Sequence, residues 1–203
     1  MAEKGQGKQS AKRPPRGLPA DTRERLVAAA AELFNRHGYH GTDSNRIAKA
    51  AGYATGTFYK HFKDKREAFL AAYEKWSDEE WKAVQVEIDE PRSAEELARR
   101  LVNLAIGFHT KWRGLRASLL ELLFTDPKVK GFFCDQRRRQ IDFMAALRAA
   151  RGWKARARED DAVLLYCCDR TYDAIARGEL PASGLNRTLV IEAMIRRVSE
   201  SLG

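Results

Sequence analysis

Long apolar runs are missing from this sequence of 203 residues. No stretch approaches the roughly 20 apolar residues that a membrane-spanning helix requires, and the first residues lack the apolar core of a secretory signal. We therefore expect a cytoplasmic chain with no membrane partner. Proline and glycine are also scarce, with six and 14 residues, while apolar residues make up 44% and charged residues 32% of the chain. This composition excludes wholesale disorder and predicts an all-α protein with a real core.

Cysteine is rare too, with Cys134, Cys167 and Cys168 as the three examples. Two adjacent cysteines cannot form an ordinary disulfide with each other, and all three lie within apolar helical patterns. The sequence predicts that they are small buried side chains in a reducing compartment. A nucleophilic pair of Cys134 with His109 has no support in the local sequence.

Patterns that bind metals or carry out catalysis are missing as well. The chain has four histidines, and none of them is in H-x-x-x-H spacing. His37 and His40 lie on either side of Gly38, which does not suit a zinc site on one helix. The sequence contains no phosphate-binding loop. We therefore expect no enzymatic activity, no metal and no cofactor.

Positive charge is in excess, and it is unevenly distributed. The formal net charge is +9. Residues 1–17 contain five basic residues and one acidic residue, and residues 18–75 contain ten basic and seven acidic residues. This concentration near one end favours an anionic partner, nucleic acid before membrane. The alternative is that the basic end is only a solubilising tail.

The first part of the chain is predicted to form an arm followed by a helical domain. Residues 1–17 lack apolar periodicity and predict a flexible basic arm. Residues 18–75 contain a first helix, two short ones and the start of a long fourth, and we assign them to one domain. Their expected starts and stops are residues typical of helix ends: Asp21 and Gly38, Asp43 and Gly52, Thr55, and the Asp64-x-x-Glu67 capping box. Two short helices joined by a glycine-containing turn predict a helix-turn-helix.

Residues 76–203 predict a second, larger helical domain. The fourth helix ends before Pro91, and Ser93-x-x-Glu96 is a further capping box. Residues 115–124 are apolar almost all round, so we expect that helix to be central. Asp126-Pro127 starts a helix that runs to about Ala150, and two more helices are expected over residues 159–177 and 185–201. The total is about nine helices with no strand.

One segment resembles a known family. Residues 38–70 begin G-Y-H-G-T-D-S-N-R-I-A-K-A-A-G-Y-A-T-G-T-F-Y-K-H-F, and an Ala-Ala-Glu-Leu-Phe run precedes them and ends at Phe34. This segment resembles the DNA-binding domain of TetR-family transcriptional regulators, with departures from the family pattern at Asp43, Ser44 and Tyr53. The resemblance implies a homodimeric repressor that binds a palindromic site in double-stranded DNA and is released by a small-molecule effector. The alternative is a structural or regulatory DNA-binding protein without ligand control.

The residues expected to touch DNA follow from the same segment. Phe58 and Phe62 should anchor the recognition helix in the core, and Gly56, which has no side chain, should let the start of that helix approach DNA closely. The resemblance implies base contacts from Thr55, Thr57 and Lys60. It also implies phosphate contacts from Thr42, Arg46, Tyr59, His61 and Lys65. Packing inside the domain is the alternative role for Tyr59 and His61.

The last two predicted helices carry apolar stripes. The resemblance implies that these helices form a four-helix bundle with those of a second chain. The residues expected at this dimer interface are Leu164, Cys168, Thr171, Ile175, Leu189, Ile195 and Val198, with Leu185 extending the second stripe. Burial of both stripes within one chain is the alternative.

Two glutamines interrupt the apolar face of the helix that follows Pro127. An unpaired buried amide costs roughly 1–3 kcal/mol, so Gln136 and Gln140 should find a partner, a water or a ligand, unless they lie at the rim. The sharper hypothesis is an effector cavity for a mostly apolar or aromatic molecule with one or two hydrogen-bonding groups, which would not suit a strongly charged one. Its expected residues are Phe108, Trp112, Leu123, Phe124, Phe133, Gln136, Gln140, Phe143, Tyr166 and Asp169.

Overall fold

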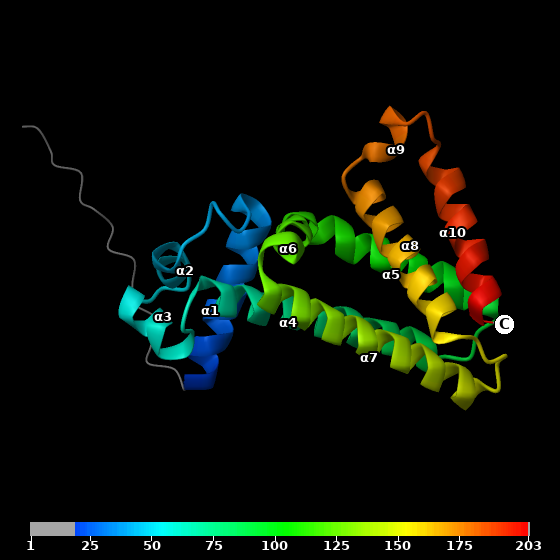
Figure 1. Cartoon of the computed structure of the whole chain (residues 1–203), viewed down its shortest axis with the longest axis horizontal. Helices are drawn as coiled ribbons and strands as arrows, with labels where there is room; N and C mark the ends of the chain where they lie inside the picture. Colours follow the sequence, from blue (N-terminus) through cyan, green and yellow to red (C-terminus); the bar gives the residue numbers. More distant parts are fainter. Residues whose placement is uncertain (1–18, 203) are drawn as a thin grey trace, which may run out of the picture. The chain divides into compact units, whose positions relative to one another are not determined.

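The computed structural model describes residues 19–202, and every regular element in that range is a helix (Figure 1). The predicted basic arm, residues 1–17, lies outside the described residues. The fold is all-α, as expected from the composition. The helices are α1 (Pro19–His37), α2 (Ser44–Ala50), α3 (Thr55–His61), α4 (Lys65–Asp89), α5 (Ala94–Lys111), α6 (Arg113–Thr125), α7 (Pro127–Arg151), α8 (Arg158–Ala176), α9 (Glu179–Ala182) and α10 (Arg187–Leu202). The one helix that was not anticipated is α9, a single turn between the last two long helices.

The chain folds as two compact units. Unit 1 ends at Ala72 and unit 2 begins at Tyr73, so the division falls within α4. Within residues 19–202, no helix is both long enough and apolar enough to span a membrane.

Local signals determine the helix ends of unit 1. Gly38 has φ 70°, and its N–H donates to the Phe34 carbonyl at 2.9 Å, which ends α1. Asp43 caps α2 by accepting from the Arg46 backbone N–H at 2.9 Å. Gly52 follows α2 with φ 83°, a conformation that costs other residues energy. These predicted ends are confirmed, whereas α1 begins at Pro19 and has Asp21 within its first turn rather than before it.

Aromatic side chains fill the core of unit 1. Phe34 packs edge to face on Phe69 with ring centroids 5.2 Å apart, and Phe58 lies 5.4 Å from Phe62. All four are almost fully buried, together with Ile47. Each such side chain contributes roughly 1.5–3 kcal/mol by leaving water, so α1 and the two short helices α2 and α3 are held in place by this core. The predicted anchoring of α3 by Phe58 and Phe62 is confirmed.

Unit 2 is built around α5, which packs against both α8 and α10 (Figure 1). Ser93 caps α5 through the predicted capping box, accepting from the Glu96 N–H at 3.3 Å while Glu96 accepts from the Ser93 N–H at 3.2 Å. The apolar core of the unit includes Leu97, Val102, Ile175 and Ile195.

A buried ion pair joins three helices of unit 2. Arg148 of α7 donates to both carboxylate oxygens of Asp161 in α8, at 2.6 and 2.5 Å. Its Nε also donates to the Ser201 carbonyl in α10 at 3.2 Å. Both charged side chains are buried, so the pair is fully withdrawn from water.

Two sequence expectations about unit 2 are wrong. The apolar segment 115–124 is not buried all round, because Phe124 is 92% exposed while the helix buries Arg116 instead. The cysteines are not small core residues either. Cys134 and Cys167 are exposed, because each lies on a side of its helix that faces away from the core, whereas Cys168 is partly buried and packs against the core.

Candidate nucleic-acid interface and effector cavity

The recognition helix α3 presents a polar surface to solvent. Phe58 points into the core, while Tyr59 is 58% exposed and Lys60 is also exposed. Gly56 lies at the start of the same helix, and a Cβ added there would meet no atom of the chain within 4 Å. Packing within the chain therefore does not require glycine at this position.

Hydrogen bonds hold the start of α3 against α2. The Thr55 hydroxyl donates to the Asn45 side-chain oxygen at 2.8 Å. Thr57 and His61 are half-buried on the same helix, and Arg46 on α2 is exposed, with its guanidinium donating to the Gly41 carbonyl. The structure thus brings the expected base-contact residues together on one short helix beside Arg46.

Two expected phosphate contacts have other partners in the structure. Thr42 is 2% exposed and its hydroxyl donates to the Leu33 carbonyl at 3.2 Å, so its side chain satisfies the end of α1 and is not available to DNA. Lys65 is half-buried, and its ammonium donates to the Tyr39 carbonyl at 2.9 Å and lies 4.1 Å from the centre of the Tyr39 ring. Burial lowers the pKa of Lys65. Lys65 is therefore held by unit 1 itself.

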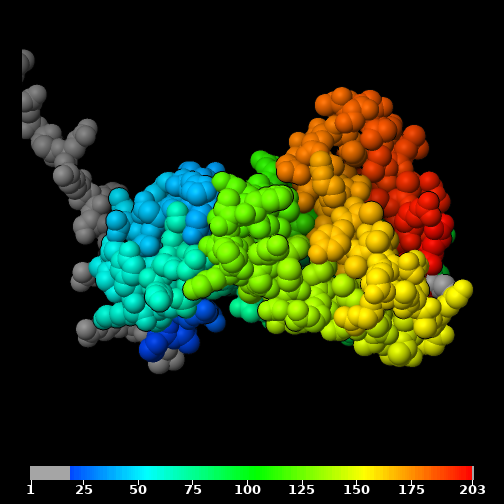
Figure 2. Space-filling model, in the orientation of Figure 1, coloured from blue at the N-terminus to red at the C-terminus, as the bar shows by residue number. Residues whose placement is uncertain are grey.

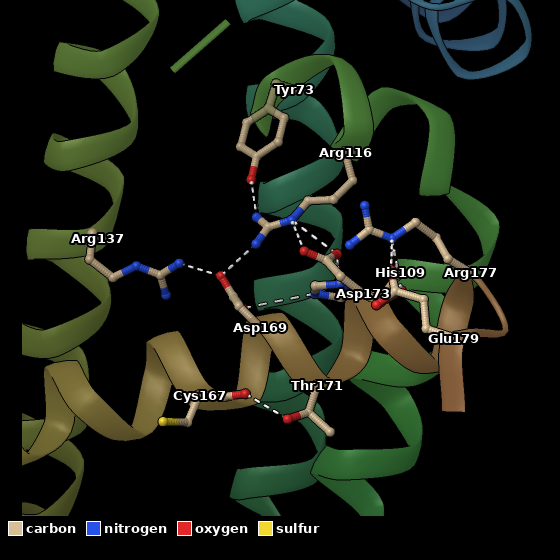
Figure 3. Close-up of polar contacts among 10 residues, drawn as sticks. All are labelled: Tyr73, His109, Arg116, Arg137, Cys167, Asp169, Thr171, Asp173, Arg177 and Glu179. Atoms are coloured by element: carbon tan, nitrogen blue, oxygen red, sulfur yellow. Dashed lines mark hydrogen bonds and ion pairs between the residues drawn. The ribbon is translucent and has the colours of Figure 1, made fainter. Parts of the chain in front are cut away.

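A network of charged side chains lies in the interior of unit 2 (Figure 3). Arg116 of α6 is its centre, because the guanidinium donates to Asp169 at 2.8 Å, to Asp173 at 3.3 Å and to the Tyr73 hydroxyl at 3.2 Å. Asp169 also accepts from Arg137, and Asp173 lies 2.9 Å from Nδ1 of His109. Helices α4, α5, α6, α7 and α8 are thus joined through polar groups.

The network keeps its two aspartates ionised. Burial alone would raise the pKa of Asp169, but Arg116 and Arg137 outweigh it and hold the pKa below the ordinary value. For Asp173, burial is again opposed, by the hydrogen bond with His109 and by the charge of Arg116, and its pKa is also lowered. Burial has the opposite effect on the Tyr73 hydroxyl and raises its pKa to about 12.

A cavity of about 170 Å³ opens beside this network. Its apolar wall comes from α4, α5, α7, α8 and α10, and includes Trp81, Leu101, Phe143, Leu147 and Leu202. The rings of Trp81 and Phe143 are in edge-to-face contact, with centroids 5.0 Å apart. The polar part of the wall consists of Glu80, His109, Arg137, Gln140 and Asp169. The wall of the cavity is thus mostly apolar and carries charged groups at one end.

The sequence anticipated only part of this cavity. Gln140, Phe143 and Asp169 line it, as expected. Gln136 is buried and lines a neighbouring groove, which shares Trp81, Gln140 and Phe143 with the cavity. The expected wall residues that do not line the cavity are Phe108, Trp112, Leu123, Phe124, Phe133 and Tyr166. Phe124 and Tyr166 are wrong for an internal wall because 92% and 51% of their side chains are exposed.

The charged end was missed by the sequence reasoning. Glu80, His109 and Arg137 of the wall were not among the expected cavity residues, nor were Arg116 and Asp173 of the adjoining network. A signal was present in α4, where Glu80 precedes Trp81 and takes a place on the apolar stripe. For Arg116 and Arg137, however, an arginine in a helix indicates a solvent-exposed side chain unless its partners are known.

The outer faces of α8 and α10 form an exposed apolar surface. Val163 on α8 and Leu189 on α10 are 63% and 68% exposed, and Leu185, just before α10, is 51% exposed. Helices α8 and α10 lie next to each other on one face of unit 2 (Figure 2). A groove of about 550 Å³ runs over this surface and is lined by Leu164, Cys168 and Thr171, three of the expected interface residues.

Three other expected interface residues lie elsewhere. Ile175 and Ile195 are 7% and 2% exposed and belong to the core of unit 2, so their assignment to an interface is wrong. Val198 is partly buried and lines the internal cavity as well. The stripes on α8 and α10 therefore have an inner part that packs on α5 and an outer part that stays exposed.

The N-terminal part of the chain matches a known protein family, and most of the chain is similar to a known repressor. Residues 26–72, which run from within α1 through α2 and α3 into α4, match the family described as "Bacterial regulatory proteins, tetR family". Over 192 residues, covering 88% of this chain and 95% of the relative, the sequence is 28% identical to the HTH-type transcriptional repressor AcnR of Corynebacterium efficiens.

Solved structures share the fold over nearly the whole chain. The transcriptional regulator FadR of Bacillus subtilis, solved in complex with stearoyl-CoA, has a TM-score of 0.66 at 16% identity, covering 89% of this chain and 99% of that one. A transcriptional regulator of Saccharomonospora viridis, solved in complex with choline, has a TM-score of 0.68 at 19% identity, covering 89% and 95%.

The helix-turn-helix of α2 and α3, the family match over it and the similarity to a curated repressor along most of the chain agree with one another. The chain is a DNA-binding transcriptional regulator, and its residues 26–72 form a DNA-binding domain of the TetR family.

Proposed function

We propose that this protein is a ligand-responsive repressor that binds a palindromic operator as a homodimer and is released by a small, mostly apolar effector. The observation that carries this proposal is the cavity of unit 2, with its apolar walls and one charged end. A protein that only clamps DNA has no need of such a cavity, whereas a sensor requires one. Release would follow if the effector favoured a conformation in which the recognition helices no longer fit DNA.

Support for ligand control also comes from proteins of similar fold. FadR of Bacillus subtilis was solved with stearoyl-CoA and the Saccharomonospora viridis regulator with choline. These two ligands differ greatly in size and charge. The ligand class for this chain therefore has to come from its own cavity residues.

For DNA recognition we propose that Thr55, Thr57 and Lys60 of α3 contact bases, while Arg46, Tyr59 and His61 contact phosphates. Exposure supports this role for Lys60, Tyr59 and Arg46. Gly56 adds support, because only an outside partner would benefit from the missing side chain.

For dimerisation we propose the exposed face of α8 and α10. Val163 and Leu189 leave a large apolar area open to water on this face, and such area is stabilised by covering it. Two copies of the face would make a bundle of four helices. Because the relatives are regulators of transcription, we propose no catalytic activity, and the protein would act on DNA in the cytoplasm.

The test begins with the DNA site. The purified protein is incubated with random double-stranded DNA, and the retained sequences are determined. We expect a palindrome whose half-sites are separated by roughly one helical turn or somewhat more. Retained sequences without any common motif would contradict an operator-specific repressor.

The second step tests ligand control. Small molecules that raise the melting temperature of the protein are added to its complex with the selected DNA, and release is followed by fluorescence anisotropy. Release by at least one stabilising ligand is expected. Ligands that stabilise the protein without any change in DNA affinity would favour the alternative, a DNA-binding protein without ligand control.

A further inference from the structure

One acidic group at the charged end of the cavity differs from its neighbours. Asp169 accepts from Arg116 and Arg137, and Asp173 is paired with Arg116 and His109. Glu80 lines the same cavity from α4, yet it forms no hydrogen bond or salt bridge with any residue between 19 and 202. Its carboxyl group is thus unpaired in a wall whose other acid, Asp169, is paired.

The surroundings of Glu80 do not supply what an ionised carboxylate needs. Burial raises its pKa to about 7. The charged groups that face it from the other helices are His109 on α5, Arg116 on α6, Arg137 on α7 and Asp169 on α8. The two arginines already pair with Asp169, so their positive charges only partly offset the effect of burial on the pKa of Glu80. Glu80 is half-buried in the wall, so its carboxyl group reaches the cavity, where it can take up a proton or a cation.

The rest of the wall suits the body of a small organic cation. Trp81 follows Glu80 on α4 and packs on Phe143, and Tyr172 adds a third ring from α8. Aromatic faces attract a positive charge within about 6 Å, and the leucines of the wall favour apolar carbon atoms. An acid beside aromatic and aliphatic side chains therefore combines the two elements that recognise a lipophilic amine.

Arg137 in the wall, which belongs to the same network as Arg116, could instead suggest an anionic ligand, but its positive charge is already paired with Asp169. Arg116 donates to Tyr73, Asp169 and Asp173. Arg137 donates to Asp169, and its guanidinium lies about 5 Å from the ring centres of Phe133 and Tyr166. Nε of Arg137 is buried without a hydrogen-bond partner among residues 19–202. A carboxylate placed here would face both Glu80 and Asp169.

We propose that the effector of this protein is a small lipophilic amine whose ammonium group pairs with Glu80 while its apolar part lies against Trp81 and Phe143. This inference rests on the proposed function, because it names the class of ligand that acts at the same cavity. Pairing with the ammonium group holds Glu80 as a carboxylate. Binding near neutral pH therefore releases a proton from the fraction of the protein in which Glu80 is protonated.

Cavity size determines the probes. A cavity of about 150 Å³ in another protein holds benzene, and this one measures about 170 Å³. Benzylamine, benzyl alcohol and benzoate are similar in shape and differ in charge, so they form a matched set of a cation, a neutral molecule and an anion. The full chain is titrated with each by calorimetry at neutral pH.

Glu80→Gln is the decisive variant, since it keeps the shape of the side chain and removes its charge. Glu79→Gln is the matched control, because Glu79 is the preceding residue on α4 and is exposed. We expect benzylamine to bind more tightly than benzyl alcohol and benzoate. Its affinity should fall roughly tenfold or more in Glu80→Gln, the usual loss for a hydrogen bond to a charged group, and stay unchanged in Glu79→Gln. Repeating the titration in buffers of different ionisation enthalpy should reveal the released proton.

Three results would overturn the amine assignment: tighter binding of benzoate than of benzylamine, equal benzylamine affinity in wild type and Glu80→Gln, or no benzylamine binding at millimolar concentration. The proposed function fails separately. If benzylamine binds through Glu80 but leaves the DNA complex intact, the amine site stands and ligand-controlled repression is wrong. If benzoate binds and releases DNA, repression stands and the amine site is wrong.

Discussion

At the scale of single residues, Glu80 makes the stability of the protein depend on pH. Its pKa is about 7 in the folded chain and 4.5 ordinarily, so the folded state binds more protons between these values and loses stability as the pH rises. Glu80→Gln should therefore become more stable than wild type over this range, by about 3 kcal/mol once the pH is above 7. Chemical denaturation at several pH values measures the difference. A constant difference between acidic and neutral pH would contradict it.

At Gly56, the requirements of folding and of DNA binding can be measured separately. Because a Cβ at this position meets nothing in the chain and alanine favours helices by up to about 1 kcal/mol over glycine, Gly56→Ala should keep or raise the melting temperature. The added methyl group should nevertheless weaken operator binding, as measured by fluorescence anisotropy. Gly131→Ala is the control, since Gly131 is a helical glycine of α7 with equally open surroundings. Unchanged operator affinity in Gly56→Ala would show that DNA does not approach this position.

The single residues also show how far the sequence can be interpreted. Gly38, Gly52 and Asp43 were predicted correctly because a turn or a cap depends on a few neighbouring residues. Arg116 and Arg137 were not predicted to be buried, since burial of an arginine depends on carboxylates that lie far away in the sequence and meet it only in the fold. Much of unit 1 could therefore be predicted, whereas the charged end of the cavity could not.

At the scale of helices, the buried pair of Arg148 and Asp161 ties α7 to α8. Arg148→Met would leave the Asp161 carboxylate buried without its partner, which typically costs about 3–5 kcal/mol. The double change Arg148→Met with Asp161→Leu should recover most of that loss. Arg158→Met is the control, because Arg158 pairs with Asp142 at an exposed site and should matter by less than about 1 kcal/mol. Urea unfolding measures all three, and an equal loss in the single and double variants would contradict the pair's role.

The stripes on α8 and α10 show a second limit of the sequence. Apolar periodicity identifies the positions that avoid water, but it does not distinguish packing on α5 from packing on a second chain. Ile195 and Leu189 belong to one predicted stripe, yet they are 2% and 68% exposed. Only the position of α5 separates the inner part of the stripe from the outer part.

At the scale of the whole molecule, the contrast between buried and exposed positions on α10 gives a test of dimerisation. Leu189→Glu places a charge on the exposed face of α10, so the variant should stay folded and become monomeric in sedimentation velocity, with much weaker operator binding. Ile195→Glu, in contrast, should unfold the chain, because it buries a charge in the core. Val86→Glu is the control, since Val86 is 65% exposed on α4. A Leu189→Glu protein that stays dimeric would show that the dimer interface lies on another surface.

The contact between Trp81 and Phe143 has a practical consequence. An indole that forms part of a cavity wall changes its fluorescence when a ligand replaces water beside it, so the protein carries its own optical reporter. The chain has four tryptophans, and the signal of Trp81 can be isolated by comparison with Trp81→Phe. Emission measured during a titration would then report occupancy of the cavity without any added dye, and a stopped-flow version would give the rate at which the cavity fills.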